Sequence, residues 1–248
     1  MSEAGLLAAA CAGYYLVAGM AICIGYHRVL SHRSAVLAKW LERTLVTLGL
    51  PAGTPMQWAG NHRFHHAHAD QPGDPHSPRD GAWWSHVGWI LFGESNHSNT
   101  RVMGKYAPDL MKHPFYVWLN NWHWVPLTVL GIALLAFGGW SVFLWGSCVR
   151  IVFGLHATWL VNSATHLWGS RRFDTRDDSR NSWWVALLTF GEGWHNNHHA
   201  HPTSARHGLA WYEFDISWIQ IKVLKFFGIA KAIRVASVNS TSSAREAA

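Results

Sequence analysis

Histidines in metal-ligand spacing are the first chemical feature of this sequence, which has 18 histidines among 248 residues. Two His-x-x-His-His motifs are formed by His62, His65, His66, His195, His198 and His199. Positions i, i+3 and i+4 share one face of a helix, so each motif presents three imidazoles together. Imidazole nitrogen binds zinc, copper, iron and nickel. The motifs therefore predict a metal site built from two helices.

Four further residues extend this set, namely His27, His32, Asn162 and His166. On an α-helix, residues five apart diverge by about 140°, so His27 and His32 converge only if the helix ends between them. Asn162 and His166 are four apart and share a face. Nine histidines exceed what one ion can take, and adjacent histidines diverge by about 100° and can serve different ions. The spacing predicts two metal ions, and the lack of cysteine ligands argues against structural zinc.

Long apolar runs must position these residues. Residues 4–26, 124–149 and 151–170 contain no Asp, Glu, Lys or Arg. At about 1.5 Å per residue, about 20 apolar residues cross a bilayer core of roughly 30 Å. Gly138 and Gly139 lie inside the second run and are expected to break a helix there. We expect three membrane spans, at about 4–26, 122–138 and 140–168.

The basic residues indicate the orientation of these spans. The chain has 20 Lys and Arg against 14 Asp and Glu, a net charge of +6. Most of the Lys and Arg residues lie in segments 27–120 and 171–238, whereas the start of the chain and the pair Gly138 and Gly139 carry no basic residue. Cytoplasmic segments of membrane proteins carry an excess of Lys and Arg, so both segments are expected in the cytoplasm. The charges are dispersed and form no stripe suited to nucleic acid, so no nucleic-acid partner is expected.

The composition excludes other classes of protein. Charged residues make up 14% of the chain, against about 25% in typical soluble proteins. Hydrophobic content of 49% excludes disorder, and three cysteines are too few for a disulfide scaffold. We predict an all-α integral membrane protein with a cytoplasmic helical cap that holds a His-rich dimetal site. Residues 1–238 are expected to form a single domain, and residues 239–248 a disordered tail.

Six segments resemble the motifs of one enzyme family. They are Gly-Tyr-His-Arg-Val-Leu-Ser-His-Arg-Ser at 25–34, Asn-His-Arg-Phe-His-His at 61–66, Asp-Pro-His-Ser-Pro at 74–78, Trp-Trp-Ser-His-Val-Gly-Trp at 83–89, Asn-Ser-Ala-Thr-His at 162–166 and Gly-Glu-Gly-Trp-His-Asn-Asn-His-His at 191–199. In this order they are similar to the membrane-bound fatty-acid desaturases, above all to the Δ9 acyl-CoA (stearoyl-CoA type) desaturases and their bacterial relatives. The resemblance covers residues 25–235.

The resemblance implies two iron ions (Fe²⁺) at the cytoplasmic face of a mushroom-shaped, all-α fold. The implied ligands are His27, His32, His62, His65, His66, His166, His195, His198 and His199, with Asn162 acting through a water. No catalytic residue beyond these ligands is implied. The family's enzymes use O2 and two electrons to place a cis double bond, in this subfamily at position 9, in a saturated acyl chain during unsaturated fatty acid biosynthesis. The family usually has two spans before the first histidine motif, where this sequence has one.

The resemblance also assigns residues around the ligands. Trp58, Thr158 and Trp159 match positions that line the family's acyl tunnel. A neighbouring carboxylate or imidazole can orient a ligating histidine through its second ring nitrogen. This supporting role is expected for Asp70, Asp74, His76, His86 and Glu192.

Partners and rival functions follow from the same resemblance. The implied partners are a saturated long-chain acyl substrate on CoA or on a lipid, a separate ferredoxin-like or cytochrome b5-like electron donor, and membrane lipid. The implied location is the bacterial inner membrane, with the active site facing the cytoplasm. One rival interpretation is a membrane diiron hydroxylase or ketolase that uses the same motifs. The other is a non-enzymatic membrane metal-binding protein.

Overall fold

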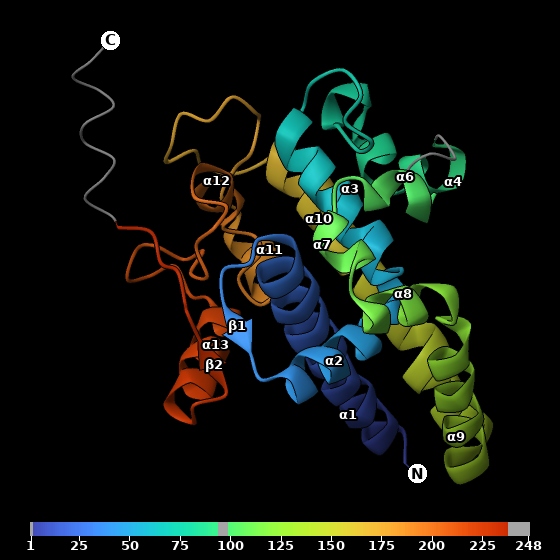
Figure 1. Ribbon diagram of the computed structural model, residues 1–248. Helices are drawn as coiled ribbons and strands as arrows, with labels where there is room; N and C mark the ends of the chain where they lie inside the picture. Colours follow the sequence, from blue (N-terminus) through green and yellow to red (C-terminus); the bar gives the residue numbers. More distant parts are fainter. Residues whose placement is uncertain (1, 94–98, 238–248) are drawn as a thin grey trace.

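Helices account for nearly all regular structure in residues 2–93 and 99–237, the part of the chain that the computed structural model describes (Figure 1). The sheet in this part has two short antiparallel strands, β1 (Val36–Leu37) and β2 (Ala230–Lys231). The predicted all-α fold is therefore confirmed. The predicted tail at 239–248 lies outside the described residues.

One long helix leads to the first histidine pair. Ser2 Oγ accepts a hydrogen bond from Gly5 N (3.2 Å), which caps α1 (Glu3–Tyr14). α1 continues directly into the π-helical η1 (Tyr15–Ser31), so that the two form one helix of 29 residues. Every residue from 21 to 31 is buried. The last turns of this helix, which carry His27, therefore lie inside the protein.

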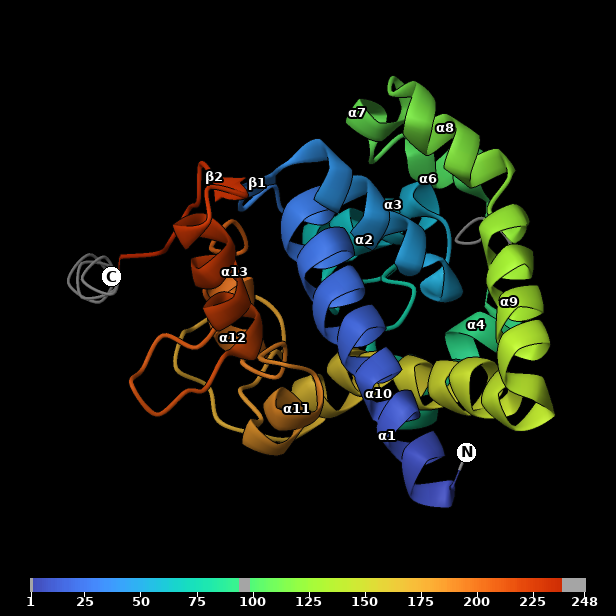
Figure 2. The same cartoon turned by 90° about the horizontal axis from the view of Figure 1, so that it is seen from below.

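A helical hairpin forms the second apolar element. It consists of α9 (Trp124–Phe143), η5 (Leu144–Val149) and α10 (Arg150–Leu167). Gly139 has φ 70° and ψ −173°, a conformation that glycine adopts without steric cost. The chain turns at this residue, and Leu134 before it lies beside Gly146 after it. α10 then packs against α1 (Figure 2).

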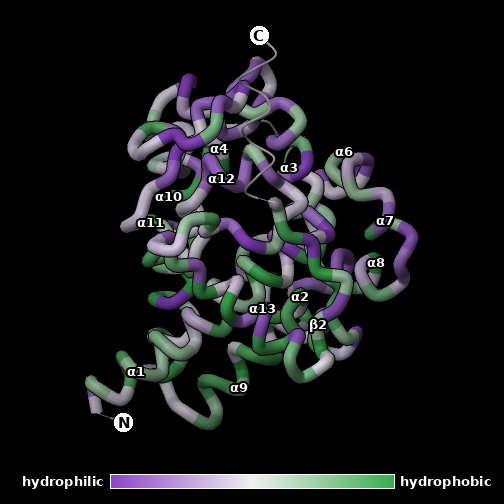
Figure 3. The backbone as a smooth tube through the Cα atoms, turned by 90° about the vertical axis from the view of Figure 1, so that its left-hand side faces the viewer, coloured by the Kyte–Doolittle hydropathy of each residue, from purple (hydrophilic) through white to green (hydrophobic). Residues whose placement is uncertain are grey.

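These two elements give the molecule its apolar end. Among the described residues, the helices Glu3–Ser31 and Trp124–Leu167 are long and apolar enough to cross a membrane. Figure 3 shows hydrophobic residues along α9 at the end of the molecule that holds the N-terminus, and hydrophilic residues gathered at the opposite end. Phe137, in the hairpin, is 93% exposed, which is typical of a surface that contacts lipid. The chain is thus an all-α membrane protein, and its division into three spans stays a prediction.

The segment between the two apolar elements folds as a cap of helices. α2 (Lys39–Leu48) and α3 (Pro55–His68) both pack against η1. α2 is amphipathic and buries Leu41, Leu45 and Val46. The other elements are η2 (Leu50–Ala52), η3 (Pro78–Asp80), η4 (Trp84–Gly88), α4 (Trp89–Phe92), α6 (Thr100–Gly104), α7 (Pro108–Met111) and α8 (Pro114–Asn121).

The C-terminal segment covers the other side of η1. α11 (Trp183–Leu188) and α12 (His195–Ala200) pack against α10, and α13 (Ile216–Phe226) packs against η1. The pairing of β2 with β1 holds this segment to the cap. η1, α3, α10 and α12, which carry all the predicted ligand histidines except His32, converge on one region.

An ion-paired arginine links the cap to the end of η1. Arg63 on α3 donates to Leu30 O (2.7 Å), Ser31 O (3.0 Å) and Asp109 Oδ1 (2.6 Å). Arg33 lies 2.9 Å from the same carboxylate. Burial alone would raise the pKa of Asp109, but the two arginines lower it to about 2. The carboxylate therefore stays charged at every physiological pH.

We expect Asp109→Asn to lower the melting temperature of the detergent-solubilised protein at pH 7. The carboxyl titrates at about 2 when folded and near 3.8 otherwise, so its contribution is complete above pH 4 and is lost as the pH falls toward 2. The pair is partly exposed, which limits the contribution to about 1 kcal/mol. Melting curves between pH 3 and 8 should show a constant difference above pH 4 that narrows below it. A difference that is equally large at pH 3 would contradict this account.

Candidate metal centre

Two helices carry the His-x-x-His-His motifs, in agreement with their spacing. The motif histidines are His62, His65 and His66 on α3 and His195, His198 and His199 on α12. Thr54 Oγ1 accepts from Gln57 N (3.4 Å) and Pro55 occupies the first turn, so the start of α3 is fixed locally. Each helix therefore presents three imidazoles on one side.

η1 ends at Ser31 and His32 is its C-terminal cap residue, so the helix ends between His27 and His32, as expected. η1 continues to Ser31, and His32 N donates to His27 O (3.1 Å). This i→i+5 bond is typical of a π-helix. Its wider turn brings residues five apart toward one face, and the two ring centroids are 4.8 Å apart. The helix end at Ser31 and the π-helical turn that precedes it together bring the two rings to one face.

The nine predicted histidines lie in two groups within the described part of the chain. The first group consists of His27, His32, His62, His66 and His198. The second group consists of His65, His166, His195 and His199. In each group the ligand atoms lie within 4.8 Å of one another. The two motif helices contribute to both groups, as two neighbouring ions require.

The nitrogen spacing within each group fits a shared metal ion. In the first group, the Nε2 atoms of His32 and His62 are 2.7 Å apart. In the second, His195 Nε2 lies 3.1 Å from His166 Nε2 and 3.0 Å from His199 Nε2. With metal–nitrogen bonds of about 2.1 Å, two ligands at a right angle place their nitrogens about 3.0 Å apart. Both groups are therefore able to hold an ion.

Burial keeps these imidazoles in the form that binds metal. It lowers the pKa of His62, His66, His195 and His198 well below 6.5, and neighbouring histidines lower it further. A neutral imidazole offers the lone pair that a metal ion needs. These four imidazoles therefore need not lose protons at neutral pH before they bind an ion.

Two carboxylates contact the Nδ1 atoms of histidines in the second group. Asp70 Oδ2 accepts from His166 Nδ1 (2.8 Å), and both oxygens of Asp74 lie 3.0 Å from His65 Nδ1. Asp70 has φ 58°, a left-handed conformation that Asp tolerates better than most residues. A proton held on Nδ1 leaves Nε2 as the ligand atom. Both carboxylates thus lie where they can orient the ligands.

The two other histidines expected in a supporting role occupy different places. The ring of His76 packs against that of His65, with centroids 4.3 Å apart. His86 instead lies 3.0 Å from Ser163 Oγ and 3.0 Å from His156 Nδ1. The structure therefore brings His76 to the second group and places His86 between η4 and α10.

Glu192 supports the first group together with residues that sequence reasoning missed. Its Oε2 lies 2.5 Å from His27 Nδ1 and 3.1 Å from His207 Nδ1. Its Oε1 accepts from the Arg28 guanidinium, which is fully buried. Burial alone would raise the pKa of Glu192, but Arg28 and the two histidines hold it well below its usual range. Only the position of Arg28 beside His27 in the sequence could have signalled this role.

Asp177 is a second residue that sequence reasoning missed. Its Oδ2 accepts from His199 Nδ1 (2.9 Å). It stands in the irregular segment between α10 and α11, 22 residues before its partner, where no helical spacing connects the two. Three of the four histidines in the second group thus each contact a carboxylate.

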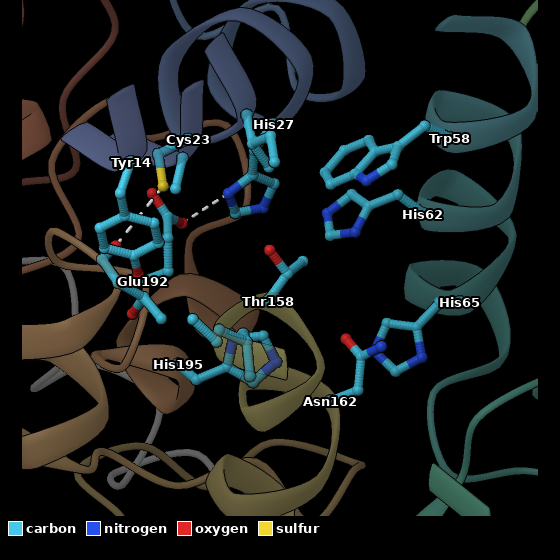
Figure 4. A pocket seen from close by; sticks show the side chains of 15 residues that line it. Tyr14, Cys23, His27, Trp58, His62, His65, Thr158, Asn162, Glu192 and His195 are labelled. Carbon is cyan, nitrogen blue, oxygen red and sulfur yellow. Dashed lines mark hydrogen bonds and ion pairs between the residues drawn. The ribbon is translucent and has the colours of Figure 1, made fainter. Parts of the chain in front are cut away.

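A cavity of about 50 Å³ lies beside the histidines (Figure 4). Its lining joins His27, His62, His65 and His195 to apolar residues of η1 and α10 such as Ile22. Figure 4 shows imidazoles from η1 and α3 facing the same space as side chains from α10. Apolar residues therefore lie next to the metal-binding groups, as a site for an apolar chain requires.

A second cavity, of about 280 Å³, adjoins the first. Trp58, His62, Thr158 and Asn162 line both cavities, whereas Trp159 lines only the second. The two cavities therefore share a wall that includes a histidine of the first group.

Comparisons with known proteins agree with this geometry. The family model described as fatty acid desaturase matches residues 4–218. The chain is 45% identical to the sn-1 stearoyl-lipid 9-desaturase of Anabaena variabilis, over 90% of this chain and 82% of that protein. It is 46% identical to the enzyme of the same name from Synechocystis sp. (90% and 70%) and 41% identical to an acyl-CoA C20 Δ5-desaturase of Anemone leveillei (92% and 73%). The chain belongs to the fatty acid desaturase family.

Proposed function

We propose that this protein is an acyl-lipid 9-desaturase, which inserts a cis double bond into a saturated acyl chain carried by a membrane lipid. The observation that carries the proposal is that two cavities share a wall, here called the junction, beside the histidine groups. This junction can present the middle of a chain to the metal centre, whereas a surface metal site would select no position along a chain. The overall reaction consumes O2, two electrons and two protons, removes two hydrogens from adjacent methylenes and releases two waters.

Two iron ions are the proposed cofactor. We assign one to each histidine group, with Asn162 adding a ligand through a water. Iron is among the metals that imidazole suits, and the nitrogen spacing of both groups supports the assignment. When bound, the ions supply the oxygen chemistry, while Asp70, Asp74, Asp177 and Glu192 orient the imidazoles.

The chain's own contribution is to position the substrate. Methylenes along an acyl chain are chemically alike, so selection of one bond depends on how deep the chain lies in the cavity. Trp58 stacks on His62, with centroids 5.1 Å apart, and gives the junction a rigid wall. Thr158 on α10 is also part of the junction wall. Apolar walls also keep bulk water away from the reacting carbons.

A lipid is favoured over CoA as the carrier. The Anabaena and Synechocystis relatives are named for stearoyl-lipid. The Anemone relative is named for acyl-CoA, so the expectation of a CoA thioester stays a candidate that experiment can separate. A lipid carrier also suits an enzyme whose apolar helices lie in the same bilayer as its substrate.

The proposed enzyme takes its electrons from a separate protein and has a defined orientation in the membrane. A ferredoxin-like or cytochrome b5-like protein delivers the two electrons. The excess of Lys and Arg in segments 27–120 and 171–238 supports an orientation with the histidine groups on the cytoplasmic side of a bacterial inner membrane.

Expression in a bacterial host that makes no Δ9-unsaturated acids tests the proposal. Gas chromatography of the lipids should show a new Δ9 monoene. Membranes given ¹⁴C-stearate, either as phospholipid or galactolipid or as stearoyl-CoA with acyl transfer blocked, should yield label in oleate only from the lipid forms. Hydroxy or keto acids alone would support the rival hydroxylase or ketolase, and conversion of the CoA form alone would contradict the lipid carrier.

A further inference from the structure

Arg28, the residue after His27, is an arginine buried inside the protein without contact to either cavity. It has no exposed surface, and it lies where η1, the turn before α12 and the segment before α13 meet. A buried arginine is costly unless its N–H groups are all paired. Its partners therefore show what it holds in place.

One edge of the guanidinium holds Glu192. Arg28 Nε and Nη2 donate to Glu192 Oε1 at 3.1 Å and 3.0 Å. Both bonds converge on this one oxygen and leave Oε2 free to contact His27 Nδ1, 2.5 Å away. The other nitrogen of that ring, Nε2, lies 3.1 Å from His198 Nε2 in the first group. Arg28 is thus linked to a metal-binding nitrogen through one carboxylate and one imidazole.

The other edge of the guanidinium holds the C-terminal segment. Arg28 Nη2 and Nη1 donate to Asp215 Oδ1 and Oδ2 at 2.9 Å and 3.2 Å, and Nη1 donates to Ala205 O at 2.7 Å. With the bonds to Glu192, these contacts use all five N–H groups of the side chain. Asp215 in turn caps α13 through Trp218 N (2.9 Å). A lysine has three N–H donors on one nitrogen and cannot reproduce this arrangement.

A close backbone approach supports the same geometry. Gly191 precedes Glu192 and has φ 115°, which side-chain-bearing residues rarely adopt. A Cβ atom at this position would lie 2.4 Å from Asp215 Oδ1. The glycine therefore allows the two carboxylates to approach the guanidinium from opposite sides.

The second histidine group has separate support. Its carboxylates are Asp70, Asp74 and Asp177, which contact His166, His65 and His199. Arg28 hydrogen-bonds none of these six residues in the described part of the chain; its partners there are Glu192, Asp215, Ala205 and His207. A change at Arg28 therefore acts on one group.

We propose that Arg28 is a positioning residue for the first histidine group alone: it locks Glu192 onto His27 and so fixes the ring nitrogen that faces the metal. The inference rests on the proposed dinuclear centre. It implies that the two metal sites can be weakened one at a time from the protein around them. Loss of an outer hydrogen-bond partner costs roughly 10–100-fold in metal affinity.

Metal content of Arg28→Lys tests the inference without reference to activity. The full-length protein is purified in detergent, stripped of metal and titrated with Fe²⁺ under anaerobic conditions. Wild type should bind two irons per chain, and Arg28→Lys about one at the same free Fe²⁺, with the second recovered at roughly 10–100-fold higher concentration. Arg43→Lys, an exposed arginine on α2, is the matched control and should bind two. Arg28→Lys with wild-type affinity for both irons would overturn the proposal.

Two further measurements separate a loss of metal binding in Arg28→Lys from a failure of this variant to fold. Melting of the metal-free proteins shows whether Arg28→Lys folds, and a folded variant that loses both irons equally would also overturn a role confined to the first group. Glu192→Gln keeps Arg28 but replaces one carboxylate oxygen by an amide, so it too should lose one iron, and two tightly bound irons would refute the link even if Arg28→Lys misfolds. Wild type that binds no iron would overturn both this inference and the proposed metal centre.

Discussion

Replacing His199 by alanine abolishes double-bond formation and removes the metal ion of the second group. His199 Nε2 lies 3.0 Å from His195 Nε2, and its Nδ1 is held by Asp177 at 2.9 Å, so the side chain is fixed for a ligand role. Without it, His65, His166 and His195 remain in that group. Gas chromatography of host lipids should show no monoene, and elemental analysis should show about one iron per chain.

His201→Ala is the matched control for this variant. His201 stands two residues further on, outside both groups, with its ring against Phe173. It should keep both irons and the double-bond activity. Monoene production by His199→Ala at the control's level would remove His199 from the ligand set.

Replacing Thr158 by tryptophan blocks desaturation and leaves the metal centre intact. Thr158 lines both cavities beside Trp58 and His62, so an indole there fills the junction that a substrate must cross. Displacement of a substrate by about 1 Å can cost roughly 10²-fold in rate. We expect a loss of at least this size in oleate formation from a stearoyl lipid, with two irons still bound.

Thr158→Val separates the effect of volume from that of chemistry. Thr158 Oγ1 donates to Gly154 O (2.9 Å) within α10, so its hydroxyl is engaged by the helix backbone. Valine keeps the size and loses the hydroxyl, so it should retain most of the activity. Overpacking can also destabilise a protein by about 1–3 kcal/mol, so melting curves accompany the assay. A folded Thr158→Trp enzyme that desaturates at the wild-type rate would show that the chain takes another path.

The spacing of the histidines predicted much of the metal centre. An i, i+3, i+4 pattern fixes a helix face wherever the helix packs, so both motifs could be assigned from sequence spacing alone. The pair His27 and His32 could not be treated in this way, because their spacing fits a π-helical turn and an α-helical projection sets them apart. η1 does end between them, at Ser31, but α-helical spacing does not reveal the π-helical turn that brings their rings together.

The residues behind the ligands were only partly predictable. Asp70 and Asp74 follow the first motif closely, and Glu192 precedes the second, so proximity in sequence suggested them. Asp215 reaches Arg28 across 187 residues, which no local pattern encodes. These contacts depend on how the C-terminal segment packs against η1, a property of the tertiary fold.

The fold, like the metal centre, was predictable from sequence only where local properties determine it. Runs without charge marked the two apolar helices, because length and hydropathy are local properties. The cavities arise between α10, η1 and α3, and their junction depends on the relative placement of three separate helices. The sequence alone identified Trp58 and Thr158 through a family resemblance; it could not show that they border two adjoining cavities.

Iron content of the purified wild-type protein tests the central claim most directly. We expect two irons per chain in an active, detergent-solubilised preparation, because the nine histidines form two groups with ligand spacing. The measurement combines elemental analysis with amino-acid quantification of the same sample. Full desaturase activity in a preparation that holds clearly fewer than two irons per chain would contradict the dinuclear centre.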